Sequence, residues 1–263
     1  MGNTESENNE QYQTEVNLSI RQRLHHQYSI NRQGLMPWLR DQMSIPANAK
    51  ILELGCGNGS LWDDYLTQLP ATIDVTLSDY SQGMVDVVAE KFGRDSRVRC
   101  LKIDAQSIPF EAATFDVVIA NHTLHTVPDT DLAIREIARV LKPTGIFYTS
   151  ANGAHGMEQY LHEKIRTVAP TSQLFSDQLS FNLQNGVPQL KAHFNQVTRC
   201  DYPDELRITK TQDLIDWIKS TQTDNDGITE TLLKQLETKF ESIRQQEGAI
   251  VIPKQVGLLI ARP

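Results

Sequence analysis

A glycine-rich segment directly after an apolar run constrains the fold of this chain more than any other feature. Residues 50–59 read Lys-Ile-Leu-Glu-Leu-Gly-Cys-Gly-Asn-Gly, and a helical pattern begins near Ser60. This pattern predicts a buried strand, a tight turn and the start of a helix. Three glycines at alternate positions let the turn adopt positive φ and bring bare backbone against a ligand.

The spacing of the glycines separates two kinds of nucleotide-binding loop. A dinucleotide fingerprint, Gly-x-Gly-x-x-Gly, needs its third glycine at position 60, where this chain has Ser60. The observed spacing is Gly-x-Gly-x-Gly, with Glu53 two residues before the first glycine. It resembles motif I of class I S-adenosylmethionine (SAM)-dependent methyltransferases, in which the loop wraps the methionine end of SAM. A glycine triplet alone is equally compatible with an ordinary tight turn.

The segments that follow extend the pattern. Apolar runs predict further strands at residues 73–79, 98–104, 114–120 and 146–150, with an amphipathic helix at 81–92. Near-continuous apolar strands that alternate with helices indicate a mostly parallel sheet covered on both faces. Ligands of such sheets bind outside the carboxyl ends of the strands. Asp79 and Asp104 fall at this edge, and so do Asn121 to His125.

Together these motifs cover residues 46–150, and the chain resembles a small-molecule class I methyltransferase of the group that includes ubiquinone- and menaquinone-biosynthesis enzymes. The segments Arg21 to Ser29 and Phe181 to Gly186 are similar to stretches in bacterial members of the family. One departure concerns the segment after the fourth strand. Many relatives carry a His-His pair there, whereas His125 is followed by Thr126 in this chain.

The resemblance implies a Rossmann-like α/β fold with a seven-stranded sheet in the order 3-2-1-4-5-7-6 and helices on both faces. We expect a sixth strand near 197–201 and an antiparallel final strand near 256–262. The predicted organisation is a disordered acidic tail at 1–16, an N-terminal helical lid at 17–45 and a SAM-binding domain at 46–263. The domain should contain a helical insertion at about 152–196.

The resemblance also implies the cofactor, SAM, which leaves as S-adenosylhomocysteine, and its contacts. Asp79 lies about twenty residues past the last glycine, where a carboxylate can accept both ribose hydroxyls as hydrogen bonds. Asp104 is expected to meet the adenine amino group. The full set of predicted cofactor-binding residues is Tyr28, Glu53, Gly55, Gly57, Asn58, Gly59, Asp79, Tyr80, Met84, Asp104, Ala105 and Asn121.

Catalysis depends on the acceptor. A hydroxyl or a protonated amine must lose its proton, and histidine is the natural general base near neutral pH. His125 is the first candidate and His122 the second, because both follow the fourth strand beside the expected methyl group. His25, His26 and His155 are further candidates. Each of these side chains is also compatible with a hydrogen-bonded structural role.

Composition narrows the acceptor and the compartment. A chain of 263 residues holds one α/β domain with a lid. Its net charge of −8 disfavours nucleic acid, which needs clustered Lys and Arg. The one basic cluster, Lys91 to Lys102, is placed at the amino end of the sheet. No apolar run approaches the roughly 18 residues that span a membrane, and no Cys/His spacing is typical of a metal site.

These observations predict a small-molecule acceptor, no nucleic-acid or membrane partner, a monomer or homodimer, and a reducing cytoplasmic location for the three scattered cysteines. Two alternatives stay open. One is a SAM-binding protein without methyl transfer, such as a sensor, an assembly partner or a pericyclase-like catalyst. The other is a nicotinamide-dependent oxidoreductase, which the missing glycine at position 60 disfavours.

Overall fold

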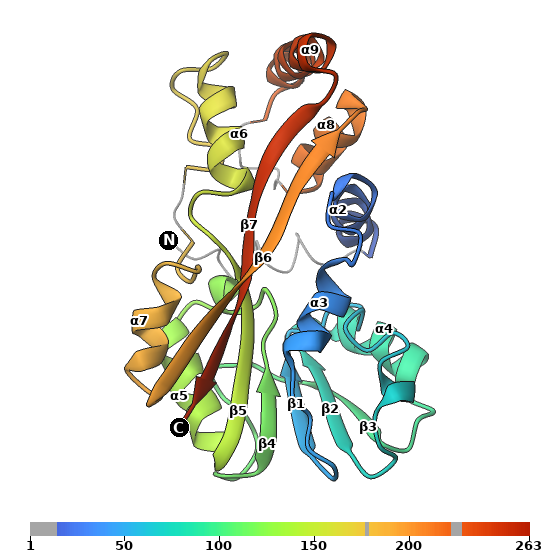
Figure 1. Ribbon diagram of the computed structural model, residues 1–263, viewed down its shortest axis with the longest axis vertical. Helices are drawn as coiled ribbons and strands as arrows, with labels where there is room; N and C mark the ends of the chain where they lie inside the picture. The colour runs from blue at the N-terminus through green and yellow to red at the C-terminus, as the bar shows by residue number, and fades with distance from the viewer. Residues whose placement is uncertain (1–14, 177–178, 222–227) are drawn as a thin grey trace.

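The computed structural model describes residues 15–176, 179–221 and 228–263, except the side chains of residues 15, 16 and 18 (Figure 1). Most of the predicted acidic tail at 1–16 lies outside the described residues, so its disorder stays a prediction. None of the described helices is long and apolar enough to cross a membrane.

A seven-stranded sheet in the order β3-β2-β1-β4-β5-β7-β6 forms the centre of the molecule, which confirms the predicted topology. Neighbours among the first five strands pair in parallel, and β7 pairs antiparallel with both β5 and β6. The strands are β1 (Lys50–Leu54), β2 (Asp74–Asp79), β3 (Val98–Lys102), β4 (Phe115–Ile119), β5 (Leu141–Asn152), β6 (Gln196–Ile208) and β7 (Ile250–Arg262).

The described α-helices are α2 (Glu15–Tyr28), α3 (Leu35–Gln42), α4 (Gln82–Phe92), α5 (Thr130–Val140), α6 (Met157–Arg166), α7 (Gly186–Lys191), α8 (Thr211–Ser220) and α9 (Glu230–Glu247). Four of them, α3, α4, α5 and α7, cover the two faces of the sheet. On one face Ile137 of α5 and Leu190 of α7 join a core with Phe147 of β5. On the other face Leu39 of α3 and Val88 of α4 share a core with the β1, β2 and β4 side chains.

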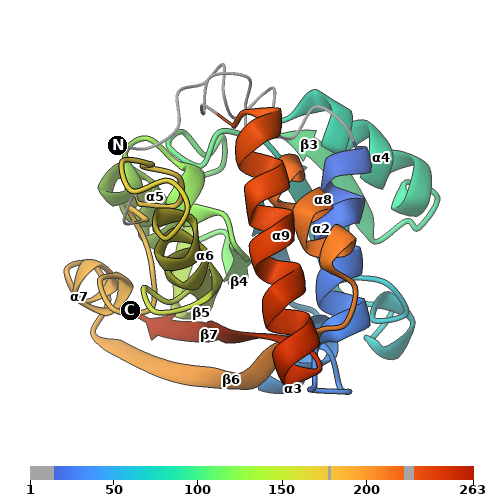
Figure 2. The same ribbon diagram turned by 90° about the horizontal axis from the view of Figure 1, so that it is seen from above.

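A second, upper lobe stands above the sheet and has its own apolar core. It consists of α2, α6, α8 and α9 and the upper ends of β6 and β7, which contribute Leu206, Ile208, Ile250 and Ile252 (Figure 1). Leu24 of α2, Leu161 of α6, Trp217 of α8 and Phe240 of α9 meet in this core. Seen from above, α9 lies between α6 on one side and α2 and α8 on the other (Figure 2).

The last two strands are longer than the sequence predicted, since we expected only 197–201 and 256–262. In the upper half of β6, every second side chain faces inward, and Tyr202, Leu206 and Ile208 are buried. The position that continues this alternation is Asp204, a charged residue that turns inward. Lys254 stands directly opposite on β7 and neutralises it. An inward charge and two prolines, at 203 and 253, concealed the strand pattern.

The two N-terminal helices belong to different cores. Leu24 and Tyr28 of α2 pack in the upper lobe, whereas Trp38 and Leu39 of α3 pack against the sheet. Their connection is joined to the edge strand β6, because the Ile30 amide donates to the Glu205 carbonyl at 3.1 Å. Movement of residues 17–45 as one lid remains a prediction.

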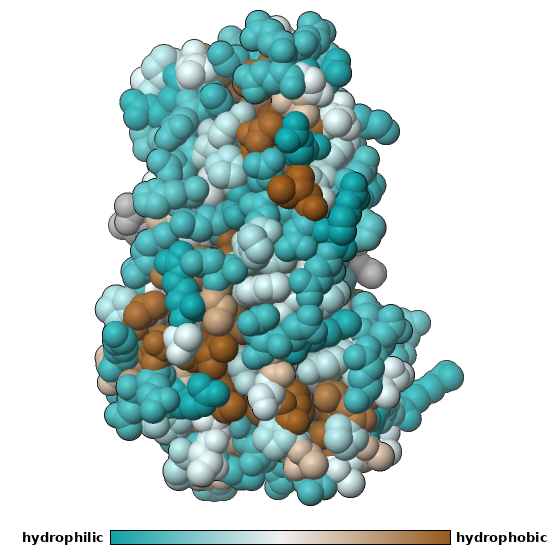
Figure 3. Space-filling view, viewed as in Figure 1, coloured by the Kyte–Doolittle hydropathy of each residue, from teal (hydrophilic) through white to brown (hydrophobic). Residues whose placement is uncertain are grey.

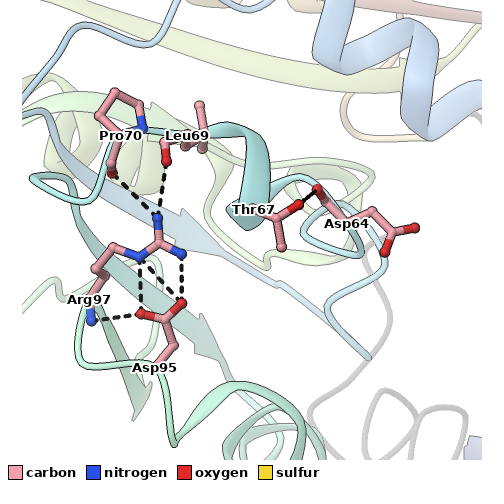
Figure 4. A network of polar contacts seen from close by, with 6 residues as sticks. All are labelled: Asp64, Thr67, Leu69, Pro70, Asp95 and Arg97. Atoms are coloured by element: carbon pink, nitrogen blue, oxygen red, sulfur yellow. Dashed lines mark hydrogen bonds and ion pairs between the residues drawn. The ribbon is translucent and has the colours of Figure 1, made fainter.

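Three of the five cations in the basic cluster, Lys91 to Lys102, pair with nearby carboxylates. The Arg97 guanidinium forms an ion pair with Asp95 at 2.7 Å and also donates to the Leu69 and Pro70 carbonyls (Figure 4). Lys91 pairs with Asp63, and Arg99 with Asp74. The face seen in Figure 3 is hydrophilic over most of its area, with apolar patches mainly over its lower half.

Candidate active site

The glycine loop after β1 adopts the conformation that its sequence requires. Gly55, Gly57 and Gly59 have φ values of +66°, +54° and +74°. A Cβ on Gly55 would lie 2.3 Å from Thr123 Oγ1, and one on Gly59 would lie 2.5 Å from the Phe92 ring. Glycine is therefore required at 55 and 59 by close packing within the protein as well as by φ.

Asp79 connects the end of β2 to this loop. Its carboxylate accepts hydrogen bonds from the Gly57 and Ser81 amides, both at 2.9 Å. Burial raises the pKa of Asp79, and the backbone N–H donors oppose this shift because they stabilise the charged form. The loop and the carboxylate thus form one hydrogen-bonded unit at the carboxyl edge of the sheet.

Glu53 and Asn121 lie behind the loop at the ends of β1 and β4. Glu53 is buried and accepts a hydrogen bond from Trp62 Nε1. Burial raises the pKa of Glu53 to about 7, although the Trp62 bond lowers it. The Asn121 carboxamide is close enough to lower this pKa slightly. Neither its Oδ1 nor its Nδ2 makes a hydrogen bond of normal geometry within the described residues.

The N-terminal helices reach the loop directly. Asn58 Nδ2 donates to Gln22 Oε1 of α2 at 3.1 Å. Arg40 of α3 donates to the Leu61 carbonyl at 2.7 Å and to the Ser60 carbonyl at 3.1 Å. One predicted lid helix, α2, is therefore bonded to the glycine loop itself, and the other, α3, to the residues directly after it.

The other predicted cofactor residues lie in varied surroundings. Tyr80 is 38% exposed beside Lys102, and Met84 and Ala105 are buried. Asp104 accepts a hydrogen bond from the Gln106 amide at 2.8 Å. Tyr28 is the exception, because it packs in the upper-lobe core and its hydroxyl donates to Asp213 of α8 at 2.6 Å. Its role in cofactor binding stays a prediction.

The structure brings His25, His122 and His125 together. His122 follows β4 with φ +49°, and His125 lies in the short 3₁₀ helix η2 (Leu124–Thr126). Burial lowers the pKa of His122 to about 3 and that of His125 to about 4. Both residues nevertheless keep part of their surface accessible. Among the described residues, no group forms a hydrogen bond with either ring.

His25 approaches this segment from α2. Burial lowers its pKa to about 3, and the nearby Lys254 and His122 lower it further in that order. All three imidazoles are therefore neutral at pH 7. His26 and His155 lie on the exposed surface instead. Of these further candidates, His25 is the one with an electrostatic interaction with His122.

A cavity of about 50 Å³ lies beside His25, between the end of β5 and the upper lobe. Its lining includes Asn152, Glu158, Trp217 and Lys254. The Lys254 ammonium bonds to Asp204 at 2.7 Å, and this pair is deeply buried, with side chains 6% and 0% exposed. Burial lowers the pKa of Lys254, and Asp204 opposes this shift.

Comparison with known proteins agrees with this geometry. Residues 52–149 match the family described as a methyltransferase domain. A demethylmenaquinone methyltransferase of Staphylococcus aureus is 36% identical over 105 residues, which are 40% of this chain and 43% of that protein. Residues 52–149 of this chain are therefore similar to a methyltransferase domain, and the sheet around them has the order expected from the class I resemblance.

Two solved structures share the fold of this methyltransferase domain and the surrounding chain. One is phosphoethanolamine N-methyltransferase 2 of Haemonchus contortus with SAM. It has a TM-score of 0.58 and 18% identity, over 95% of this chain and 57% of that one. The other is the [4+2]-cyclase SpnF, with a TM-score of 0.54 and 19% identity, over 87% and 80%. At such identities the likeness shows the fold alone.

Sequence reasoning missed four residues that line or support the cavity beside the methyltransferase domain. They are Asn152, Glu158, Trp217 and Lys254. Lys254 carried a usable signal, because it is a lone cation between the apolar residues Ile252 and Val256. Glu158 and Trp217 lie on helices whose polar and apolar patterns are ordinary. Their convergence is visible only in three dimensions.

Proposed function

We propose that this protein transfers the methyl group of SAM to a small organic acceptor. The observation that carries the proposal is the unit formed by three glycines with positive φ and the Asp79 carboxylate at the carboxyl edge of the sheet. The unpartnered Asn121 carboxamide beside it suits a ligand that offers both donors and acceptors. The methyltransferase named in S. aureus supports the same chemistry over the matched segment.

The residues present fit the cofactor. In this proposal the loop 55–59 holds the methionine end, Asp79 accepts the ribose hydroxyls and Asp104 meets the adenine amino group. Asp79 uses only part of its acceptor capacity on the Gly57 and Ser81 amides, so further hydrogen bonds can be added. The α2 helix, held on Asn58, would close the site on the side of the loop.

Bound SAM would supply a methyl group on a sulfonium leaving group, and the protein's main task is to align the acceptor with it. His125, and after it His122, are proposed to accept a proton or a hydrogen bond from the acceptor. Both are neutral at pH 7, which a base requires. Their low pKa values make them weak bases, so alignment contributes more to the rate than proton removal.

A second candidate function is SAM binding without methyl transfer, as a sensor, a partner or a pericyclase-like catalyst. The fold shared with the cyclase SpnF is the observation in its favour. Both proposals include a small-molecule ligand, and both are compatible with a monomer or a homodimer. Both also include a reducing cytoplasmic location, which suits the free Cys56, Cys100 and Cys200.

Two experiments test the proposal. Calorimetry with SAM, S-adenosylhomocysteine and NAD(H) should show binding of the first two only, and binding of NAD(H) alone would indicate an oxidoreductase. Incubation with methyl-labelled SAM and a metabolite extract should then transfer label to a small molecule. SAM binding without any transfer of label would favour the second candidate.

A further inference from the structure

A half-buried carboxylate without a cation stands out in the cavity beside His25. Glu158, in the first turn of α6, lines this cavity, and burial raises its pKa. Its one hydrogen-bond partner among the described side chains is Asn152 Nδ2, at 3.0 Å. No described Lys, Arg or His forms an ion pair with it. The segments 1–14, 177–178 and 222–227 contain no such residue in their sequence.

The nearest cation in the cavity is already neutralised. Lys254 bonds to Asp204 at 2.7 Å, and the two residues stand directly opposite each other on β7 and β6. The Asp204 carboxylate is completed by Ser29 Oγ at 2.6 Å and the Asn31 amide at 3.1 Å. The charge of Glu158 is therefore the uncompensated charge of the cavity. A charge removed from water without a partner destabilises the folded state, so its presence here indicates a function.

The rest of the lining also suits a cation. Trp217 contributes an aromatic ring, and such rings attract ammonium groups. His25 stands edge-on to this ring, with centroids 6.4 Å apart. Its imidazole is neutral at pH 7 and its buried Nδ1 has no hydrogen-bond partner, so it can accept a hydrogen bond. Carboxylate, neutral imidazole and indole face one space.

The cavity also limits the size of its ligand and lies close to the expected transfer site. A volume of about 50 Å³ holds the equivalent of about three to five water molecules. A headgroup with about four heavy atoms, such as an ethanolamine unit, matches this space. The cavity adjoins the segment after β4, because Asn152 on its wall lies two residues past Ser150, whose carbonyl accepts a hydrogen bond from the His122 amide at 3.0 Å.

We propose that this cavity binds the ammonium group of a small amine through Glu158, and that this amine is the methyl acceptor. The inference rests on the proposed function and names its substrate class. For this acceptor the ammonium proton passes to the Glu158 carboxylate instead of to His125, which leaves a neutral amine, and the neutral histidines keep the hydrogen-bonding role of the proposed function. The nitrogen lone pair then forms a bond to the methyl carbon while the carbon–sulfur bond breaks, and sulfur keeps the electron pair.

Calorimetry on the full chain with S-adenosylhomocysteine present tests the binding step. Ethanolamine is the probe, and ethylene glycol and acetate are its uncharged and anionic counterparts. We expect ethanolamine to bind at least about tenfold more tightly than either counterpart, and Glu158→Gln to remove this preference. The matched control is Glu163→Gln, an exposed carboxylate on the same helix whose partner is Gln159. It should retain the preference.

The outcomes separate this inference from the proposed function. Equal affinity for ethanolamine and ethylene glycol, or tighter binding of acetate, would overturn the amine site while SAM binding still supports methyl transfer. Absence of SAM binding would instead overturn the proposed function. Transfer of label from SAM to an amine, lost in Glu158→Gln and kept in Glu163→Gln, is the expected activity result.

A stability measurement distinguishes a ligand-binding role from a structural one. A structural Glu158 would make Glu158→Gln less stable than the parent protein at every pH. An uncompensated buried carboxylate predicts the reverse above neutral pH, because its raised pKa makes the folded state lose stability as the pH rises. Urea unfolding that shows Glu158→Gln to be clearly destabilised at pH 8 would overturn the proposal.

Discussion

The ion pair between Lys254 and Asp204 should contribute far more to stability than any surface pair in this protein. Lys254→Met leaves the Asp204 carboxylate, 0% exposed, without its cation. Breaking a buried pair in this way costs about 3–5 kcal/mol. Asp204 keeps its hydrogen bonds from Ser29 and Asn31, so we expect a loss near the lower limit, about 3 kcal/mol.

The reverse change should be milder. Asp204→Asn leaves Lys254 buried, but burial already lowers the pKa of this lysine, so it can lose its proton. We expect a loss of about 2 kcal/mol in the free energy of unfolding. The double variant should lose about 2 kcal/mol less than the sum of the two single losses. The control is Arg99→Ala, whose partner is Asp74 and whose side chain is 59% exposed. It should cost less than about 1 kcal/mol.

Urea unfolding followed by far-ultraviolet circular dichroism measures all four variants. The pair joins β6 to β7 and holds the α2–α3 connection, so its loss should lower the free energy of unfolding of the whole chain. The reasoning fails if Lys254→Met loses no more than Arg99→Ala. It also fails if the two buried changes are simply additive.

Three further predictions concern the active site. Asp79→Ala should weaken SAM binding by about 1.5–3 kcal/mol in calorimetry, the range for hydrogen bonds to a charged group, and a loss below about twofold would mean that another carboxylate holds the ribose. His125→Ala should lower turnover by about 10²–10⁴ with little change in SAM affinity, if proton removal occurs in the transition state. The turnover of the parent protein should fall on the acidic side near pH 4, where His125 gains a proton, and the variant should lack this fall. The neutral, buried His25 has a folded pKa of about 3 against an ordinary value of 6.5. As the pH falls, His25 therefore gains a proton in the unfolded state before it does so in the folded state. The free energy of unfolding falls as the pH drops below 6.5, by up to about 1.4 kcal/mol per pH unit. His25→Gln should reduce that slope in urea unfolding between pH 7 and pH 5, and an unchanged slope would contradict the burial of His25.

The part of the site that the sequence predicted is the part encoded locally. Gly55, Gly57 and Gly59 lie within five residues after one apolar run, and Asp79 ends the next strand. Their positions follow from strand periodicity and from the parallel order of the sheet. Because the carboxyl ends of parallel strands meet at one edge, residues far apart in the chain could be placed together.

The cavity could not be predicted in this way. Glu158, Trp217 and Lys254 come from α6, α8 and β7, and the angles between these elements depend on the packing of the upper lobe. The long upper ends of β6 and β7 were missed because Asp204 interrupts the apolar alternation. Its burial is explained only by Lys254, fifty residues away in sequence and directly opposite in the sheet.

The most direct test of the central claim is calorimetry of SAM binding to Gly57→Val beside a matched glycine variant. Gly57 has φ +54° and its amide bonds to Asp79, so a branched side chain there should distort the loop that is proposed to hold SAM. Gly83→Ala is the control, because its Cβ would meet Ser81 Oγ at an ordinary 3.7 Å in α4. We predict that Gly57→Val folds and binds no SAM while Gly83→Ala binds like the parent protein. Unchanged SAM affinity in a folded Gly57→Val variant would contradict the assignment of this loop.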